Sequence, residues 1–242
     1  MPKIKHLALR KKIIATCLRM NSEGINRGTS GNVSARIEEG FLVTASGVPY
    51  ATMKPEHVVE MDLDGGYRGD YLPSTEWRMH LDIYRNRPEA NAVVHVHSIY
   101  ATALACLRKE IPAFHYMIGW TGGISLKVAT YAEFGTQGLS DAMLKALEGR
   151  TACLLANHGQ ICLAPDLDRA FSLAREVETL CQQYWAASVA GDPVILSEEQ
   201  MSSVLSRFKT YGKQQSQLDE GDMPAVMAPK RRDVAKATRR RR

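Results

Sequence analysis

The sequence predicts an α/β fold in which helices pack around a central β-sheet in one main domain. Segments with apolar residues at helical spacing alternate with short runs rich in Val, Ile and Leu, and clusters of turn-forming residues separate them. The chain has 242 residues, 45% apolar and 24% charged, which suffices for a sizeable core. This composition excludes collagenous, wholly disordered and membrane-spanning classes.

The amino-terminal part is predicted to form a helix followed by strands. Apolar residues at helical spacing cover Leu7–Asn21, and Gly24 is suited to end that helix. Short β-like runs then alternate with turn clusters up to residue 64. The strands expected there cover residues 32–37, 41–45 and 57–63.

The remaining elements alternate between helix and strand. A helix is expected to begin near Ser74, with a polar cap and Glu76 in its first turn, and to stop before Pro88. In order, there follow a strand over 91–98, a helix over 99–108, a strand over 112–119, a capped helix within 134–149, a strand pair over 151–164, and helices over 166–190 and 197–211.

The positive charge lies at the carboxyl end. The net charge is +5, but the last 22 residues hold eight Lys or Arg and two Asp, which leaves −1 for the first 220. Residues 1–212 therefore form the expected domain, and residues 213–242, poor in apolar side chains, form a basic tail expected to be disordered. Nucleic-acid binding is not expected except through this tail.

The amino terminus and the cysteines favour a cytoplasmic protein. The longest uncharged run near the start, Ile13–Leu18, is too short for the core of a signal peptide, and no stretch reaches the ~18 apolar residues of a membrane span. The five cysteines are odd in number, widely spaced and set in apolar surroundings, so we expect buried reduced thiols. No membrane association is expected.

Three histidines are candidate metal ligands. His95 and His97 lie two residues apart in a predicted strand, so both side chains point to one face. His158 is expected at the end of another strand, in Asn-His-Gly. A catalytic zinc site uses three protein ligands and leaves one position open, so His158 is the candidate for the third ligand. Taken alone, a His-x-His pair also fits two ordinary polar residues on a half-buried strand. The other four histidines have no partner at ligand spacing.

Three segments could bind an anion. The residues around Gly31 and Asn32, and the pair Ser46-Gly47, offer backbone N–H groups beside small polar side chains, and Ser74-Thr75 lies at a predicted helix N-terminus. Each is also compatible with an ordinary turn or cap, and none fits a nucleotide-binding glycine pattern. Glu76 is either a surface residue in the first helical turn or a general acid/base beside a bound substrate.

Together these residues resemble a known family. The chain resembles class II aldolases of the fuculose-phosphate aldolase, ribulose-phosphate 4-epimerase and adducin-head superfamily from about Ile25 to Tyr211, and is most similar to L-fuculose-1-phosphate aldolases. The matching segments, in order, are GTSGNVS, ASGVPY, PSTEWRMHLDIYRNRPEANAVVHVHS, IPAFHYMIG, YAEFGT, NHG and FKTYG. The resemblance implies a mostly antiparallel central sheet flanked by helices.

The resemblance also implies the roles of particular residues. His95, His97 and His158 match the ligands of one zinc ion per subunit, and Glu76 matches the catalytic acid/base, which also ligates the metal in the absence of substrate. Members of the family are homotetramers with active sites between subunits, and Tyr116 matches a proton donor from a neighbouring subunit. The phosphate-binding positions match Gly31, Asn32, Ser46, Gly47, Ser74 and Thr75, and the aldehyde pocket, also formed across the subunit interface, matches Phe134, Phe208 and Tyr211.

The implied activity is that of a lyase. A ketose 1-phosphate would be cleaved between C3 and C4 into dihydroxyacetone phosphate and an aldehyde, through an enediolate whose charge the zinc stabilises. Mn²⁺ or Co²⁺ could occupy the same ligands.

The sequence is compatible with two classes of substrate, which differ in the aldehyde that cleavage releases. His-Val-His-Ser and Gly119-Trp120-Thr121 depart from the fuculose-phosphate aldolase pattern, and the indole of Trp120 is compatible either with a more apolar aldehyde end or with interface packing. L-fuculose 1-phosphate and 5-deoxyribulose or 5-methylthioribulose 1-phosphate, the latter pair serving methionine salvage, are therefore both candidates.

Three alternative functions share this fold. A pentulose 5-phosphate 4-epimerase usually has Asp at the position of Glu76, and a methylthioribulose-phosphate dehydratase is a further zinc relative. An adducin-head-like interaction module would lack the intact set of histidines that this chain has.

Overall fold

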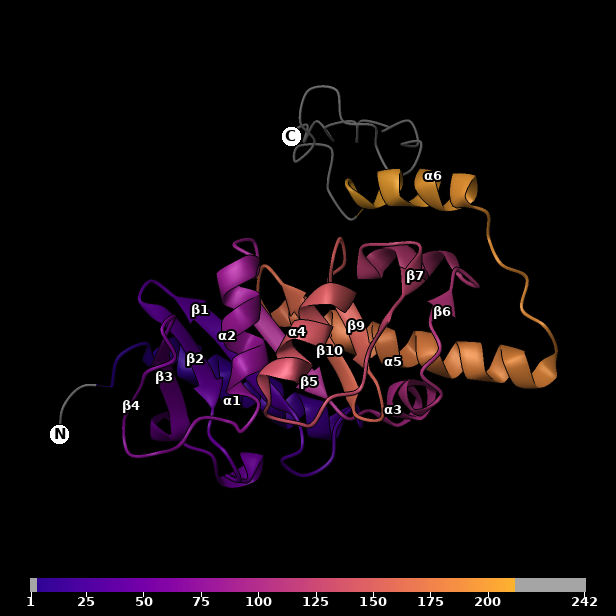
Figure 1. Cartoon of the computed structure of the whole chain (residues 1–242). Coiled ribbons are helices and arrows are strands. Elements are labelled where there is room, and N and C mark those ends of the chain that lie inside the picture. The colour runs from indigo at the N-terminus through magenta and orange to yellow at the C-terminus, as the bar shows by residue number, and fades with distance from the viewer. Residues whose placement is uncertain (1–3, 212–242) are drawn as a thin grey trace, which may run out of the picture.

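The computed structural model describes residues 4–211, and the predicted tail over 213–242 lies outside them. Its centre is an eight-stranded sheet of order β4-β3-β2-β1-β5-β10-β9-β8 (Figure 1). Every neighbouring pair is antiparallel except β8 and β9, which are parallel. The strands are β1 Asn32–Ile37, β2 Gly40–Thr44, β3 Val58–Asp62, β4 Tyr67–Arg68, β5 Ala92–Val96, β8 Val128–Ala129, β9 Ala152–Leu155 and β10 Gly159–Ala164.

Helices cover both faces of this sheet. The α-helices are α1 Leu7–Ser22, α2 Trp77–Asn86, α3 Ile99–Cys106, α4 Gln137–Ala146, α5 Leu167–Ala190 and α6 Glu198–Phe208. Short 3₁₀ turns cover Tyr50–Thr52, Pro55–His57 and Tyr116–Thr121, and β6 Ile111–Pro112 pairs with β7 Ser125–Leu126. No helix of the described part is long and apolar enough to span a membrane.

The alternation of side chains along the strands divides the core into two layers. Val94 and Val96 of β5 pack on the face covered by α1, α3 and α5, whereas Val93 packs on the face covered by α2 and α4. His95 has the same parity as Val93, so its side chain lies on the face of α2 and α4. This arrangement places the predicted ligands beside the N-terminus of α2.

The segment over 112–119 is not the strand that its apolar pattern predicted. Only Ile111–Pro112 is extended, and a 3₁₀ helix follows from Tyr116. The ring of His115 accepts a hydrogen bond from the backbone N–H of Met117 at 3.3 Å, and Gly122, at φ 94°, ends the turn. A local side-chain cap therefore replaces the backbone pairing that a strand requires.

Two smaller expectations also differ from the structure. Helix α2 begins at Trp77 and Glu76 occupies its N-cap, so this carboxylate does not lie in the first turn and makes no capping hydrogen bond. Among the cysteines, four are buried as expected, but Cys106 at the end of α3 is exposed. The hairpin predicted over 151–164 is confirmed as β9 and β10.

Candidate metal centre and active site

Strand β5 positions two of the candidate ligands at the middle of the sheet. β5 is paired on both sides, with His95 opposite Asn32 of β1 and Ile161 of β10. His95 is fully buried, and His97 follows one residue beyond the end of the strand, on the same face. Pairing on both sides fixes the backbone that carries the two imidazoles.

The tight turn between β9 and β10 supplies the third histidine. Asn157 adopts a left-handed conformation with φ 55°, which Asn tolerates, and His158 follows it. A Cβ atom at Gly159 would lie 2.5 Å from the carbonyl oxygen of Val96, so only glycine allows the turn to pass this close to β5. His158 is thereby brought next to His97.

Glu76 is placed by backbone contacts between the end of β2 and the segment just before α2. The N–H of Ser74 donates to the carbonyl of Thr44 at 2.9 Å, and Ala45 forms an isolated bridge with Pro73. The carboxylate of Glu76 is 5% exposed and points inward, toward the histidines. It is a buried acid beside a cluster of imidazoles. This placement supports the role of a general acid/base over that of a surface residue in the first helical turn.

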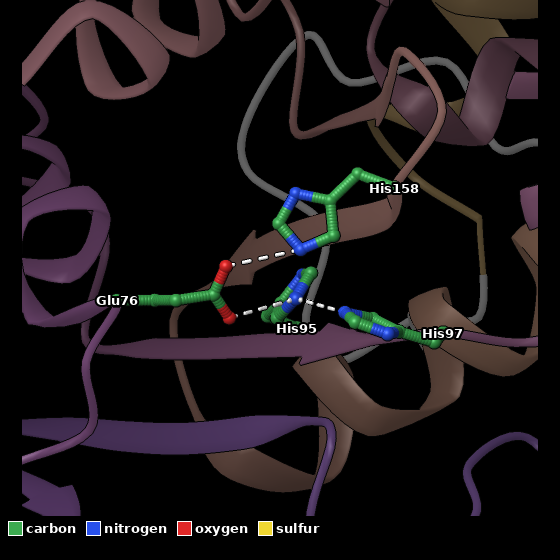
Figure 2. A group of neighbouring side chains, drawn as sticks. All are labelled: Glu76, His95, His97 and His158. Atoms are coloured by element: carbon green, nitrogen blue, oxygen red, sulfur yellow. Dashed lines mark hydrogen bonds and ion pairs between the residues drawn. The ribbon is translucent and has the colours of Figure 1, made fainter. Parts of the chain in front are cut away.

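The four side chains converge on a common point, as Figure 2 shows. One ligand atom from each of Glu76, His95, His97 and His158 lies within 4.8 Å of the others. Oε2 of Glu76 is 3.1 Å from Nε2 of His95, and Oε1 is 3.0 Å from Nε2 of His158. The Nε2 atoms of His95 and His97 are 2.9 Å apart. Four potential donors on three different elements therefore face one small volume.

The hydrogen bonds around this group fit a divalent cation. Nδ1 of His95 donates to the backbone carbonyl of Gln160 at 2.8 Å, which leaves the Nε2 lone pair of the neutral ring directed at the centre. Oε1 of Glu76 is buried, and its close polar neighbour is Nε2 of His158 at 3.0 Å. A buried carboxylate that faces several imidazole nitrogens is stabilised when a cation binds between them, and a His₃/Glu set suits zinc and related metals.

The electrostatics of the metal-free group favour a neutral His97 and an ionised Glu76, whereas burial, which would lower the pKa of His95, is outweighed by attraction to Glu76, which raises it. Burial lowers the pKa of His97 to about 3, and nearby His95 and His158 act in the same direction. Burial alone would raise the pKa of Glu76, but attraction to His95 and His158 holds that pKa well below its usual range. Neutral imidazoles and a carboxylate are the forms that bind metals.

A cleft of about 330 Å³ opens beside these side chains. Glu76, His97 and His158 form part of its wall, together with Thr75 and Ser30. Two exposed aromatic residues, Tyr131 and Phe134, line the same cleft. Of the residues expected at the aldehyde end, Phe134 therefore lies beside the metal group of its own chain.

The residues expected to bind phosphate come from three segments that the fold brings near this cleft. The N–H of Ser46 donates to the carbonyl of Leu72 at 3.0 Å, which places the Ser46-Gly47 turn next to Ser74 and Thr75. Gly31 lies directly against His95, because a Cβ there would be 2.6 Å from the carbonyl of His95. Asn32 is 3% exposed and donates from Nδ2 to Oε2 of Glu76 at 2.9 Å.

The other aromatic residues expected at the site gather elsewhere. Tyr116 stacks on Phe208 with ring centroids 6.4 Å apart, and Phe208 contacts Tyr211 at 5.6 Å. Phe208, Tyr211 and Trp120 line a second cavity of about 440 Å³ that contains none of the candidate ligands. Within one chain, the structure does not bring this cluster together with the cleft.

Sequence reasoning missed the buried polar residues that contact the site. His80 is fully buried and reaches Asn32 through its ring, although the sequence singled it out only as a histidine without a ligand partner. The sequence feature that could have identified His80 is its spacing of four residues from Glu76, which places both residues on one face of α2. Tyr131 was also missed, although its segment was among those that carry the resemblance.

Comparisons with known proteins agree with this geometry. A family model described as the class II aldolase and adducin N-terminal domain matches residues 11–185. The chain therefore belongs to the class II aldolase and adducin N-terminal domain family.

Individual relatives narrow the class to sugar-phosphate aldolases. The chain is 46% identical over 206 residues to a 5-methylthioribulose-1-phosphate/5-deoxyribulose-1-phosphate aldolase of Rhodospirillum rubrum, covering 85% of this chain and 93% of the relative. It is 47% identical over 205 residues to the L-fuculose phosphate aldolase of Escherichia coli strain K12, covering 84% and 95%. A solved L-fuculose 1-phosphate aldolase has a TM-score of 0.82 at 38% identity, covering 85% of this chain and 98% of that structure.

Proposed function

We propose that this protein is a metal-dependent aldolase that cleaves a ketose 1-phosphate into dihydroxyacetone phosphate and an aldehyde. The observation that carries the proposal is the convergence of Glu76 with His95, His97 and His158 beside a cleft. The family and the named relatives are aldolases, which are lyases. The intact ligand set also separates the chain from a purely structural interaction module.

The chain's own side chains have distinct tasks in this reaction. His95, His97, His158 and Glu76 would hold the cation, for which we propose Zn²⁺, with Mn²⁺ or Co²⁺ as substitutes. When bound, the cation supplies a Lewis acid that stabilises negative charge on substrate oxygens while the C3–C4 bond breaks. The ionised carboxylate of Glu76 would first accept the proton that the substrate releases as the C3–C4 bond breaks, and would then deliver it to C3, the carbon that keeps the electron pair of the broken bond.

The phosphate end of the substrate would be held by backbone N–H groups and small hydroxyls. Ser46 and Gly47 lie beside Ser74 and Thr75, and Thr75 borders the cleft. No lysine or arginine is among the residues lining this cleft, so neutral donors and the N-terminus of α2 would carry the binding. We include Gly31 and Asn32 at the side nearest to His95.

The aldehyde end would be completed by a second subunit, and we propose a homotetramer. Tyr116 is 49% exposed and Tyr211 63% exposed, and both lie in the aromatic cluster away from the cleft of their own chain. Exposed aromatic side chains are typical of protein interfaces. In the assembly, Tyr116 would exchange the proton of the aldehyde oxygen, with Phe208 and Tyr211 beside it and Phe134 contributed by the cleft.

One test of the reaction is a panel of ketose phosphates assayed for dihydroxyacetone phosphate with a coupled reductase. We expect release from L-fuculose 1-phosphate or from 5-deoxyribulose and 5-methylthioribulose 1-phosphates, loss of activity with a chelator, and recovery with Zn²⁺. Activity that survives complete removal of metal would contradict the proposal. An epimerase or a dehydratase would convert its substrate without releasing dihydroxyacetone phosphate.

The position of Trp120 supports the methylthioribulose and deoxyribulose phosphates as substrates. The indole lies in the cavity shared by Phe208 and Tyr211, which Arg169 and Lys209 also line, so an apolar aldehyde would meet the apolar face of the indole there. We expect Trp120→Ala to lower kcat/KM for 5-methylthioribulose 1-phosphate more than for L-fuculose 1-phosphate, whose aldehyde carries a hydroxyl. Equal losses for both substrates would assign Trp120 to interface packing.

A further inference from the structure

A buried row of polar side chains runs between helix α2 and strand β1 behind the candidate metal centre. His80 and Tyr84 follow Glu76 at intervals of four residues, so the three share one face of the helical segment. Asn32 and Ser34 are two residues apart on one face of β1. These two faces meet, and their side chains alternate across the contact.

Four hydrogen bonds connect this row from end to end. Glu76 Oε2 is 2.9 Å from Asn32 Nδ2, and Asn32 Oδ1 is 2.5 Å from His80 Nε2. His80 Nδ1 is 2.6 Å from Ser34 Oγ, which is 2.7 Å from the hydroxyl of Tyr84. All five residues are at most 5% exposed. Water therefore cannot replace a missing partner without rearrangement of the core.

The chemistry of each group fixes the direction of these bonds. A carboxylate only accepts, so Asn32 must present its NH₂ group to Glu76 and its carbonyl oxygen to His80. That oxygen also only accepts, so His80 must donate from Nε2. The neutral ring then accepts at Nδ1 from Ser34, and the hydroxyl of Tyr84 donates to Ser34.

We propose that His80 is a positioning residue for the catalytic carboxylate, acting through Asn32. By donating to Oδ1, His80 prevents the amide of Asn32 from rotating by 180° and presenting its oxygen to Glu76. The correctly oriented amide holds Oε2 of Glu76, while Oε1 faces Nε2 of His158 at the centre. This inference rests on the proposed function, because it concerns the orientation of its acid/base.

His80 positions Glu76 through Asn32, and the row does not conduct protons to Glu76. An amide NH₂ group does not lose its proton at neutral pH, so Asn32 interrupts any transfer from His80 to Glu76. Burial also lowers the pKa of His80 to about 3, which keeps its ring neutral. The neutral ring offers one donor and one acceptor, which is what the row requires at this position.

The first test compares His80→Phe, His80→Gln and Tyr84→Phe in the metal-loaded enzyme. Phe cannot donate to Asn32, so we expect kcat to fall about 10- to 100-fold with KM changed less than about threefold. Gln keeps a donor and an acceptor, so its kcat is expected within about threefold of the parent. Tyr84→Phe is the matched control, because it removes one buried hydrogen bond beyond His80 and should leave kcat within about twofold.

Three outcomes in the His80 variants would overturn the inference. They are an unchanged kcat in His80→Phe, a loss in His80→Gln as large as in His80→Phe, and a loss confined to KM. A similar kcat loss in Tyr84→Phe at matched thermal stability would also overturn it, because general loosening of the core would then explain the data.

A second measurement is made on the parent protein and does not depend on activity. Long-range ¹H–¹⁵N NMR of the ¹⁵N-histidine-labelled parent protein reports which ring nitrogen carries the proton, and the His80 signal is assigned by its absence in His80→Gln. We expect a proton on Nε2 and none on Nδ1. A proton on Nδ1 would reverse the row and overturn the inference.

These readouts separate failure of the inference from failure of the proposed function. If the parent cleaves no ketose phosphate, the proposed function fails, while the tautomer still decides the direction of the row. If the parent is active and His80→Phe is equally active, only the inference fails.

Discussion

Asn32 shows how one buried amide can serve two purposes. It occupies a position expected to bind phosphate, yet both ends of its side chain are engaged within the protein, by Glu76 on one side and His80 on the other. Its remaining amide N–H is the group that could reach a substrate. A change at this residue would therefore affect substrate binding and the orientation of the acid/base together.

The titration of His80 gives a stability prediction at the scale of a single residue. Burial is the main cause that lowers its pKa to about 3 from an unfolded value near 6.5. Between these values the unfolded chain binds a proton that the folded chain does not, so stability falls as the pH drops below about 6.5. Between pH 7 and pH 5 this contribution amounts to about 2 kcal/mol.

Urea denaturation of the metal-free parent and of His80→Gln at both pH values measures this contribution. We expect the loss on acidification to be smaller in the variant, because Gln does not titrate. Equal losses in the two proteins would show that His80 is not the group responsible.

At this scale the sequence predicted the group of side chains that converges at the candidate metal centre, but it did not predict the buried residues behind that group. His95, His97, His158 and Glu76 could be found because their side chains suit metal binding and because they match a family pattern. His80 could not be separated from an ordinary core histidine, since its partner on β1 lies 48 positions away in the chain. Contacts of that range follow from strand order, which local spacing does not reveal.

At the scale of elements, the contact between β1 and β5 sets the distance between the phosphate segment and the metal ligands. Gly31 lies where any side chain would meet the carbonyl of His95 at 2.6 Å and Oδ1 of Asn26 at 2.8 Å. We expect Gly31→Ala to lower the free energy of unfolding by about 1–3 kcal/mol and to reduce activity, because β1 must shift away from β5.

A glycine in a helix provides the matched control for this substitution. A Cβ at Gly138, in the first turn of α4, would meet its neighbours at 3.7 and 3.8 Å, which are ordinary contacts. Gly138→Ala should therefore stabilise the protein by about 0.5 kcal/mol or more. Thermal unfolding of both variants compares them, and equal stabilities would contradict the steric argument.

Helices and central strands were predictable because their apolar periodicity is long and regular. The segment over 112–119 was not, because a short apolar run fits a strand and a tightly packed turn equally well. Phe114 packs against Tyr184 of α5 with ring centroids 5.1 Å apart, and His115 caps the turn that follows. Tertiary packing and a local cap therefore decided its conformation.

At the scale of the whole molecule, the aromatic cluster around α6 makes a prediction about assembly. Figure 1 shows α6 set apart from the sheet and joined to α5 by an extended segment. If Tyr116 acts in the site of a neighbouring subunit, Glu76→Gln and Tyr116→Phe are each inactive alone but complement each other. Random mixing of the two variants should restore about a quarter of the parent activity, because each site then needs one intact residue from each of two subunits.

Co-expression of the two variants with different affinity tags, followed by purification of mixed oligomers, allows this measurement. Sedimentation analysis of the parent should show a tetramer. Mixed oligomers with no more activity than either variant alone would place Tyr116 in the site of its own chain, or outside the reaction.

The row between α2 and β1 also constrains the lengths of these two elements. Four helical residues advance about 6.0 Å and two strand residues about 6.8 Å, so the two repeats stay in step over the short distance from Glu76 to Tyr84. Arg36, the next β1 residue of the same parity, continues the alternation with its guanidinium 4.8 Å above the ring of Tyr84. A one-residue insertion in this part of α2 would rotate Glu76 by about 100° relative to the rest of the row. The position of the Glu76 carboxylate therefore depends on the lengths of α2 and β1. These two elements can accept substitutions more readily than insertions or deletions.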